Sequence, residues 1–262
     1  MKPYFEEDGI TIYHGDCMQV LAEIENVHCT VTSPPYGSIR EYGGYFEFEW
    51  RETFALLWHC TLEGGVVVWN AADQVIDGSE TGISFRQMLR GMECGFRLHD
   101  TMIYCKESVT YPDCNRYLPA FEYMFILSKG APLHFNGIKD RKNLHAGSTI
   151  HGPQRLADGR MEPKCRDGQI VPDFGLRLNW WILNPASTEP SNGHPARMPS
   201  SMARGHVRTW TDPGETVLDP FMGSGTTLRA AKDLGRRAIG IEIEEKYCEI
   251  AAKRLAQKVL PL

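Results

Sequence analysis

The segment VLDPFMGSGTTLRAAKDLGRRAIGIEI, residues 217–243, shows how the C-terminal part of the chain folds. Its apolar start ends at Asp219 and leads into a turn that contains Gly223 and Gly225. A helical stretch and a second apolar run, which ends at Glu242, come next. Strand, glycine-rich turn, helix and strand in this order predict a βαβ unit, the building block of a doubly wound parallel sheet.

The turn and Glu242 also have the properties of a site for a nucleoside cofactor. Glycines let the backbone approach a ligand closely, and a helix N-terminus offers N–H groups to a carboxylate. Glu242 follows Asp219 by 23 residues, and an acid at that distance can accept hydrogen bonds from both ribose hydroxyls. A GxG turn alone is equally consistent with a tight connection, so this interpretation depends on the whole segment.

The N-terminal half shows the same alternation of strands and helices. A strand, a turn at Gly15 and Asp16 and a short helix come first. The predicted elements that follow are a strand over 28–32, a helix over 51–65 that closes on two glycines, a buried strand over 66–69, a helix over 84–95 and strands over 98–106 and 122–129.

The sequence SPPYG follows the strand 28–32 and has the properties of a catalytic turn. Pro34 and Pro35 fix an extended backbone and lack N–H donors, so the carbonyl oxygens at this strand end can only accept hydrogen bonds. One group that needs such acceptors is the exocyclic amino group of a nucleic-acid base. This amino group is a poor nucleophile, because its lone pair is delocalised into the ring. Hydrogen bonds to the Pro34 carbonyl and the Ser33 hydroxyl would favour a pyramidal nitrogen, and Tyr36 would stack on a flipped base.

Together, SPPY and DPFMGSGTT resemble the catalytic and cofactor motifs of the amino-group DNA methyltransferases. The resemblance covers nearly the whole chain outside its middle segment, and the order of the motifs is that of the permuted β class. It implies a Rossmann-like α/β fold, S-adenosylmethionine as cofactor and DNA as partner, and a homodimer is compatible with it. The catalytic residues that it implies are Ser33, Pro34, Pro35 and Tyr36.

The same resemblance assigns residues to the cofactor. The segment GDCMQVL implies that Asp16 hydrogen-bonds the adenine, and Glu242 is implied to bind the ribose. The residues implied to surround the methionine end are Asp219, Phe221, Gly223, Ser224, Gly225 and Thr226, with His194 and Pro195 of the preceding motif enclosing it.

The middle of the chain differs from the rest in charge and periodicity. Between residues 131 and 178 there are eight basic and five acidic side chains, whereas the whole chain has a net charge of -5. We therefore expect a catalytic part at 1–129, a loop-rich target-recognition lobe at 130–178 and a cofactor-binding part at 179–262. The expected DNA-binding residues of the lobe are Lys139, Arg141, Lys142, Arg155, Arg160, Lys164 and Arg166.

Composition narrows the class of protein further. Apolar residues make up 42% of the chain and charged residues 23%, as in an ordinary globular enzyme. The eight cysteines never adopt the CxxC spacing of a zinc site, so we expect reduced thiols and no metal. No apolar run reaches the roughly 18 residues of a membrane span, and the expected location is the cytoplasm.

Several related activities compete with this interpretation. A cytosine C5 methyltransferase would need a nucleophilic cysteine, usually after proline, and no cysteine here follows a proline. Protein glutamine methyltransferases carry Asn-Pro-Pro-Tyr after the glycine-rich loop, which differs in residue and order. An RNA methyltransferase and a catalytically silent DNA-binding subunit stay open. In the family that the motifs resemble, serine before Pro-Pro-Tyr more often accompanies the 4-amino group of cytosine, and aspartate the 6-amino group of adenine; we expect cytosine, with adenine as the alternative.

Overall fold

The computed structural model describes residues 1–35, 49–106, 116–184 and 198–256. The chain divides into two compact units, of which the larger contains Met1–Asn136 and Asn179–Leu262 and the smaller Gly137–Leu178. Each unit is described separately below. The expected boundaries of the three functional parts, at 129 and 178, remain a prediction.

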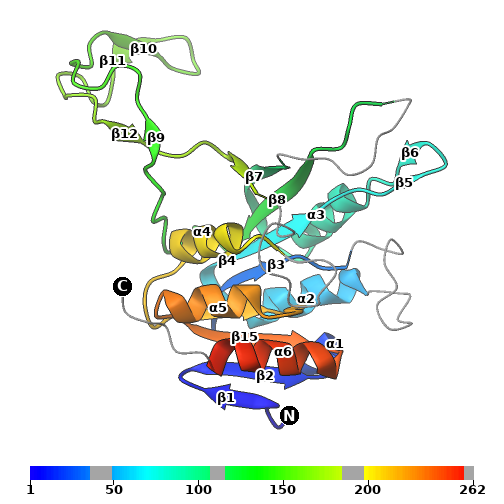
Figure 1. Cartoon of the computed structure of the whole chain (residues 1–262). Helices are drawn as coiled ribbons and strands as arrows, with labels where there is room; N and C mark the ends of the chain where they lie inside the picture. Colours follow the sequence, from blue (N-terminus) through cyan, green and yellow to red (C-terminus); the bar gives the residue numbers. More distant parts are fainter. Residues whose placement is uncertain (36–48, 107–115, 185–197, 257–262) are drawn as a thin grey trace. The chain divides into compact units, whose positions relative to one another are not determined.

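The larger unit is built on one sheet, which contains nine strands in the described part of the chain (Figure 1). In spatial order they are β1 (Phe5–Glu7), β2 (Ile10–His14), β15 (Arg237–Glu242), β14 (Thr216–Asp219), β3 (Val27–Thr32), β4 (Thr61–Ala71), β8 (Phe121–Ser128), β7 (Arg97–Lys106) and β13 (Trp180–Leu183). Only β1 and β8 among these strands run against their neighbours. The other strands are parallel, so their carboxyl ends meet at one edge of the sheet.

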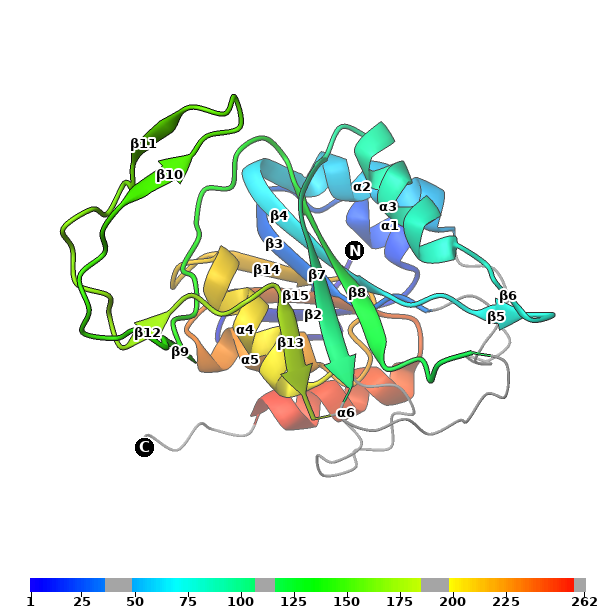
Figure 2. The same ribbon diagram turned by 90° about the horizontal axis from the view of Figure 1, so that it is seen from above.

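Helices cover both faces of this sheet (Figures 1 and 2). On one face lie α1 (Cys17–Leu21), α2 (Trp50–Cys60) and α3 (Ile83–Glu93), and on the other lie α4 (Ser200–Trp210), α5 (Thr226–Asp233) and α6 (Glu245–Ala256). The predicted doubly wound α/β architecture is therefore confirmed, including the βαβ unit β14–α5–β15.

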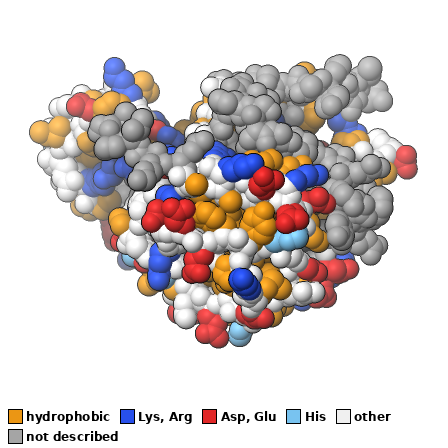
Figure 3. All heavy atoms as spheres, turned by 60° about the horizontal axis from the view of Figure 1, so that its bottom comes forward, with side chains coloured by type: hydrophobic (Ala, Val, Ile, Leu, Met, Phe, Trp, Pro, Cys, Tyr) orange, Lys and Arg blue, Asp and Glu red, His pale blue; other side chains and the backbone are white. Residues whose placement is uncertain are grey.

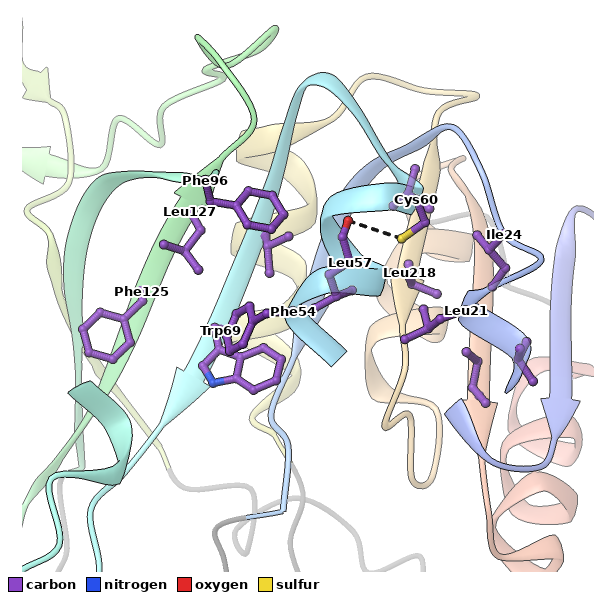
Figure 4. Packing of buried hydrophobic residues seen from close by; sticks show 14 of the residues in the cluster. Leu21, Ile24, Phe54, Leu57, Cys60, Trp69, Phe96, Phe125, Leu127 and Leu218 are labelled. Atoms are coloured by element: carbon purple, nitrogen blue, oxygen red, sulfur yellow. Dashed lines mark hydrogen bonds between the residues drawn. The ribbon is translucent and has the colours of Figure 1, made fainter. Parts of the chain in front are cut away.

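The hydrophobic core on the first face joins α1 and α2 to the middle of the sheet (Figure 4). The Trp69 side chain of β4 is fully buried and packs on Phe54 of α2, with ring centroids 4.5 Å apart. The Cys60 thiol donates to the Leu57 carbonyl at 3.5 Å and is buried within the same cluster. This packing fixes β4, so the residue that follows Trp69 has a defined position on the opposite face.

The prediction for Gly64 and Gly65 was wrong. Instead of closing a helix that reaches residue 65, these glycines lie within β4, because α2 ends at Cys60 and the strand begins at Thr61. Gly64 has a φ of +79°, and a Cβ on Gly65 would lie 3.0 Å from the Val27 carbonyl oxygen. The pairing of β3 with β4 shifts register here, so the glycines permit a bulge.

Two charged side chains of this region, one within β8 and one directly after it, form specific contacts. Lys129 Nζ donates to the carbonyl oxygens of Trp58 and Thr61, each at 2.7 Å, and lies 4.7 Å from the centre of the Trp58 ring. It therefore stabilises the C-terminal end of α2. Glu122 lies in a polar network that belongs to the candidate site.

The smaller unit has little regular structure. Its described residues form two short antiparallel ribbons, one of β9 (Arg141–Lys142) with β12 (Phe174–Gly175) and one of β10 (Pro153–Arg155) with β11 (Met161–Pro163). The rest of the unit consists mainly of turns.

The surface carries charges of both signs, and the cysteines are free thiols. In Figure 3 the face of the larger unit shows basic and acidic side chains interspersed. Among the described residues, Cys29, Cys60 and Cys248 are buried thiols and no disulfide is formed. No helix within the described ranges is long and apolar enough to cross a membrane, and the same ranges contain no cluster of metal ligands.

Candidate active site

Four of the predicted catalytic and cofactor-binding residues lie at the carboxyl-end edge of the sheet. Asp16 follows β2, Ser33 follows β3, Asp219 ends β14 and Glu242 ends β15. Ligands of open α/β sheets bind outside the carboxyl ends of the strands. Four segments that are far apart in the sequence thus supply groups to one edge.

Asp219 links the glycine-rich turn after β14 to the end of β3, which Ser33 follows. Its Oδ1 accepts hydrogen bonds from the Thr32 hydroxyl at 2.7 Å and from the Phe221 N–H at 3.2 Å. The side chain is buried, and burial raises the pKa of its carboxyl group to about 6. Because it holds the ends of β3 and β14 together, Asp219 fixes the turn at Phe221 relative to Ser33.

Glu242 lies against the glycine-rich turn. One carboxylate oxygen accepts from the Gly223 N–H and the other from the Glu244 N–H, each at 2.9 Å. Burial is the main cause that raises the pKa of this carboxyl group. A carboxylate has about four acceptor positions, so these two bonds orient it and leave capacity for the two hydroxyls of a ribose.

The turn itself fits the methionine end of the cofactor. Gly225 is the N-cap of α5 with a φ of +78°, and no side chain caps this helix end. The first N–H groups of a helix lack partners within the helix and favour an anion. Phe221 lies edge-on to Trp69 with ring centroids 6.3 Å apart, which fixes its ring beside the turn.

Two residues of the cofactor motif are oriented toward a neighbouring helix. A Cβ on Gly225 would lie 3.0 Å from the Ala251 Cβ of α6, so packing as well as conformation requires glycine there. The Thr226 hydroxyl accepts a hydrogen bond from Arg254 of α6 at 3.2 Å. Gly225→Val would therefore disturb the packing of α5 on α6.

Asp16 has a structural contact at the sheet edge. Its Oδ1 accepts from the Met18 N–H at 2.9 Å and caps the N-terminus of α1. The Gly15 N–H donates to the Glu242 carbonyl oxygen at 2.9 Å, which holds this turn beside β15. The expected hydrogen bond between Asp16 and the adenine of the cofactor stays a prediction.

The catalytic segment begins directly after β3. Ser33 and Pro35 are partly buried and Pro34 is buried, and the Ser33 Oγ lies 3.4 Å from Asn70 Nδ2 at the end of β4. The expected contributions of Tyr36, His194 and Pro195 lie outside the described residues.

A polar network beside Ser33 is the part of the site that the sequence interpretation missed. Asn70 Nδ2 donates to Glu122 Oε2 at 2.6 Å, and Lys106 Nζ pairs with Glu122 Oε1 at 2.7 Å. The Asn70 side chain is buried, and that of Glu122 is only 12% exposed. The sequence pattern that could have indicated Asn70 is its position directly after the apolar run VVVW, where a polar residue ends a buried strand.

The seven expected DNA-binding residues all lie in the smaller unit and are exposed. Some of them hold this unit together: Arg141 Nε donates to the Leu176 carbonyl at 3.0 Å, Lys164 Nζ donates to the His151 carbonyl at 3.2 Å, and Arg160 pairs with Asp158. Within the described residues, no ion pair is formed by Lys139, Lys142, Arg155 or Arg166.

Comparison with known proteins determines the family. The sequence model of the DNA methylase family matches residues 27–253. This chain belongs to the DNA methylase family. The predicted enzyme class is thereby confirmed: the protein is an S-adenosylmethionine-dependent DNA methyltransferase that acts on an amino group.

Individual relatives support the family, the fold and the cofactor of this methyltransferase. The chain is 44% identical to the orphan methyltransferase M.BamHII of Bacillus amyloliquefaciens over 254 residues, which covers 94% of this chain and 92% of that protein. The M1.HpyAVI complex with S-adenosylmethionine has a TM-score of 0.65 at 26% identity and covers 95% of this chain and all of that one. The cytosine-N4-specific PvuII DNA methyltransferase, at 19% identity and a TM-score of 0.71, covers 99% of this chain and 91% of its own and shows the fold alone.

Proposed function

We propose that this methyltransferase transfers the methyl group to the 4-amino group of cytosine in DNA, by direct attack of a base that is flipped out of the duplex. The observation that carries the proposal is the position of Ser33 beside Asn70, directly before the buried Pro34, at the edge of the sheet that also holds Glu242. The 6-amino group of adenine is the alternative, since a serine can serve either base.

In this proposal the residues that follow β3 bind the amino group of the base and prepare its nitrogen for attack. S-adenosylmethionine supplies the methyl group when it is bound at the glycine-rich turn. The Pro34 carbonyl accepts a hydrogen bond from the amino group and favours a pyramidal nitrogen. The nitrogen would attack the methyl group, the electron pair of the broken carbon–sulfur bond would stay on the cofactor's sulfur, and the proton lost from the nitrogen would pass to water. Tyr36 stacks on the flipped base in this proposal.

The smaller unit is proposed as the part that holds the duplex. Its exposed Lys and Arg side chains provide contacts to phosphates, which position DNA without specifying its sequence. Arginine with bidentate reach provides the chemistry to recognise a guanine edge in the major groove.

A homodimer is part of the proposal, supported by α3. Its Phe85, Leu89 and Met92 are 42%, 51% and 43% exposed and recur at helical spacing, so they form one apolar stripe on the surface. Light scattering after gel filtration tests this expectation: twice the mass of one chain agrees with it, and the mass of a single chain contradicts it.

The target base is tested by the product. The enzyme is incubated with unmethylated genomic DNA and S-adenosylmethionine with a deuterated methyl group, and the DNA is digested to nucleosides for mass spectrometry. Labelled 4-methylcytosine is expected, with a reaction lacking enzyme as the control. Labelled 6-methyladenine as the only product would overturn the choice of base.

A further inference from the structure

Three polar side chains run diagonally across one face of the sheet toward Ser33. Asn70 on β4 pairs with Met124 on β8, and Glu122 lies two residues before Met124. Tyr104 on β7 pairs with Glu122, and Lys106 lies two residues farther along. Alternate residues of a strand share a face, so the order across the sheet is Lys106, Glu122, Asn70 and then Ser33.

The chemistry of these groups fixes the direction of each hydrogen bond. A carboxylate only accepts and an ammonium only donates, so Glu122 accepts from both Lys106 and Asn70. The Asn70 amide must therefore present its nitrogen to Glu122 at 2.6 Å. Because the same nitrogen lies 3.4 Å from the Ser33 Oγ, Ser33 accepts in this contact.

We propose that Lys106 and Glu122 set the orientation of the Asn70 amide and, through it, make Ser33 a hydrogen-bond donor toward the target base. This inference rests on the proposed function. Lys106, Glu122 and Asn70 are positioning residues in this account, and Ser33 is the group that contacts the base.

A donating hydroxyl has a defined partner in the base. Cytosine and adenine each carry an unprotonated ring nitrogen next to the carbon that bears the amino group, and this nitrogen accepts hydrogen bonds. Ser33 then donates to the ring nitrogen while the Pro34 carbonyl accepts from the amine.

Glu122→Gln reverses this direction while each contact from Lys106 through residue 122 and Asn70 to Ser33 keeps one donor and one acceptor. The glutamine oxygen accepts from Lys106, so its NH2 faces Asn70. The Asn70 amide then turns its oxygen toward the glutamine and toward Ser33, which becomes the donor to Asn70. We expect methyl transfer in a single turnover to fall by at least about tenfold, the size of one misdirected hydrogen bond.

Combining Glu122→Gln with Lys106→Met distinguishes a positioning role of Glu122 from a purely structural one. Without the ammonium, the glutamine oxygen is no longer drawn away from Asn70 and can accept from it, as the carboxylate does. The loss of methyl-transfer rate caused by Glu122→Gln should therefore be clearly smaller in the Lys106→Met background than in the wild-type background. A loss of stability or of packing would give the same or a greater cost in both.

The experiment measures single-turnover methyl transfer to unmethylated genomic DNA for the wild type, both single variants and the double variant. Calorimetric affinity for S-adenosylmethionine should be unchanged in all four. Glu215→Gln is the matched control, because Glu215 is 19% exposed and pairs with His134 at 2.9 Å beside the opposite end of β14; it should transfer at the wild-type rate.

The possible results separate the two proposals. Equal losses from Glu122→Gln in both backgrounds, or no loss in the wild-type background, would overturn the positioning role while the wild-type product still supports the proposed function. A wild-type enzyme whose product contains no methylated amino group would overturn both.

Discussion

Asp219→Asn tests whether the residue that joins the two halves of the site is a buried carboxyl group with a raised pKa. In the wild type, Oδ1 accepts from the Thr32 hydroxyl and the Phe221 N–H, and an asparagine oxygen can accept both bonds. The asparagine NH2 can donate to the Thr227 hydroxyl, which itself donates to the Val31 carbonyl at 3.2 Å. The variant should therefore keep the local structure.

The size of the effect follows from the pKa. Burial raises the pKa of Asp219 from 3.8 to about 6, so the folded state binds the proton more tightly than the unfolded state. The contribution of the proton to stability is present below the unfolded pKa and is lost as the pH rises through the folded pKa. Two pKa units correspond to roughly 3 kcal/mol at about 1.4 kcal/mol each, an upper figure for the loss between about pH 4 and pH 7.

Urea unfolding of wild type and Asp219→Asn at several pH values measures this contribution. As the pH rises from about 4 to about 7, the free energy of unfolding of the wild type should fall by about 2 to 3 kcal/mol relative to that of Asp219→Asn. Taking the difference cancels groups that titrate alike in both proteins. Parallel pH profiles would refute the reasoning, since they would show that Asp219 is ionised in the fold without cost.

Three further predictions concern the cofactor, the DNA and the fold. Glu242→Gln should weaken the calorimetric affinity for S-adenosylmethionine by roughly 10- to 100-fold, because charge-assisted hydrogen bonds contribute about 1.5 to 3 kcal/mol; unchanged affinity would remove Glu242 from the site. Lys142→Glu combined with Arg166→Glu should weaken DNA binding and lower the slope of log affinity against log salt by about 2, and an equal loss of cofactor affinity would indicate misfolding. Lys129→Met should lower the free energy of unfolding by about 2 kcal/mol, because two carbonyls at the end of α2 lose their donor, and should leave methyl transfer at the wild-type rate; unchanged stability would contradict this.

The regular elements of the fold were predictable because their periodicity and turn residues agree. The strands that end at Thr32, Asp219 and Glu242 and the helix that follows Gly225 lie where the sequence placed them. The bulge at Gly64 and Gly65 was missed, because two glycines after a helical pattern are also typical of a helix end.

Other elements were missed for different reasons. The helix α4 has a visible pattern, since Met202, Val207 and Trp210 are buried on one side of it, but the segment was interpreted only by its resemblance to a motif. The strand β13 spans four residues and pairs with β7, and a run this short carries no periodicity of its own.

The candidate site was predictable only where a motif marks it. Ser33 and Glu242 stand in recognisable motifs, whereas Asn70, Lys106 and Glu122 are brought together by the pairing of β4, β8 and β7. Strand pairing between distant segments depends on the whole fold, so no local pattern shows that a carboxylate orients the amide beside Ser33.

Ser33, directly after β3, is proposed to act on the base and not on the cofactor. The measurement that tests it most directly is the single-turnover rate of methyl transfer to DNA by Ser33→Ala at saturating S-adenosylmethionine, with cofactor affinity measured by calorimetry on the same protein. We expect a rate about ten- to a hundredfold below the wild type, because one hydrogen bond of roughly 1 to 3 kcal/mol is lost in the transition state, and an unchanged affinity for the cofactor. A wild-type rate, or an equal loss of cofactor affinity, would contradict it.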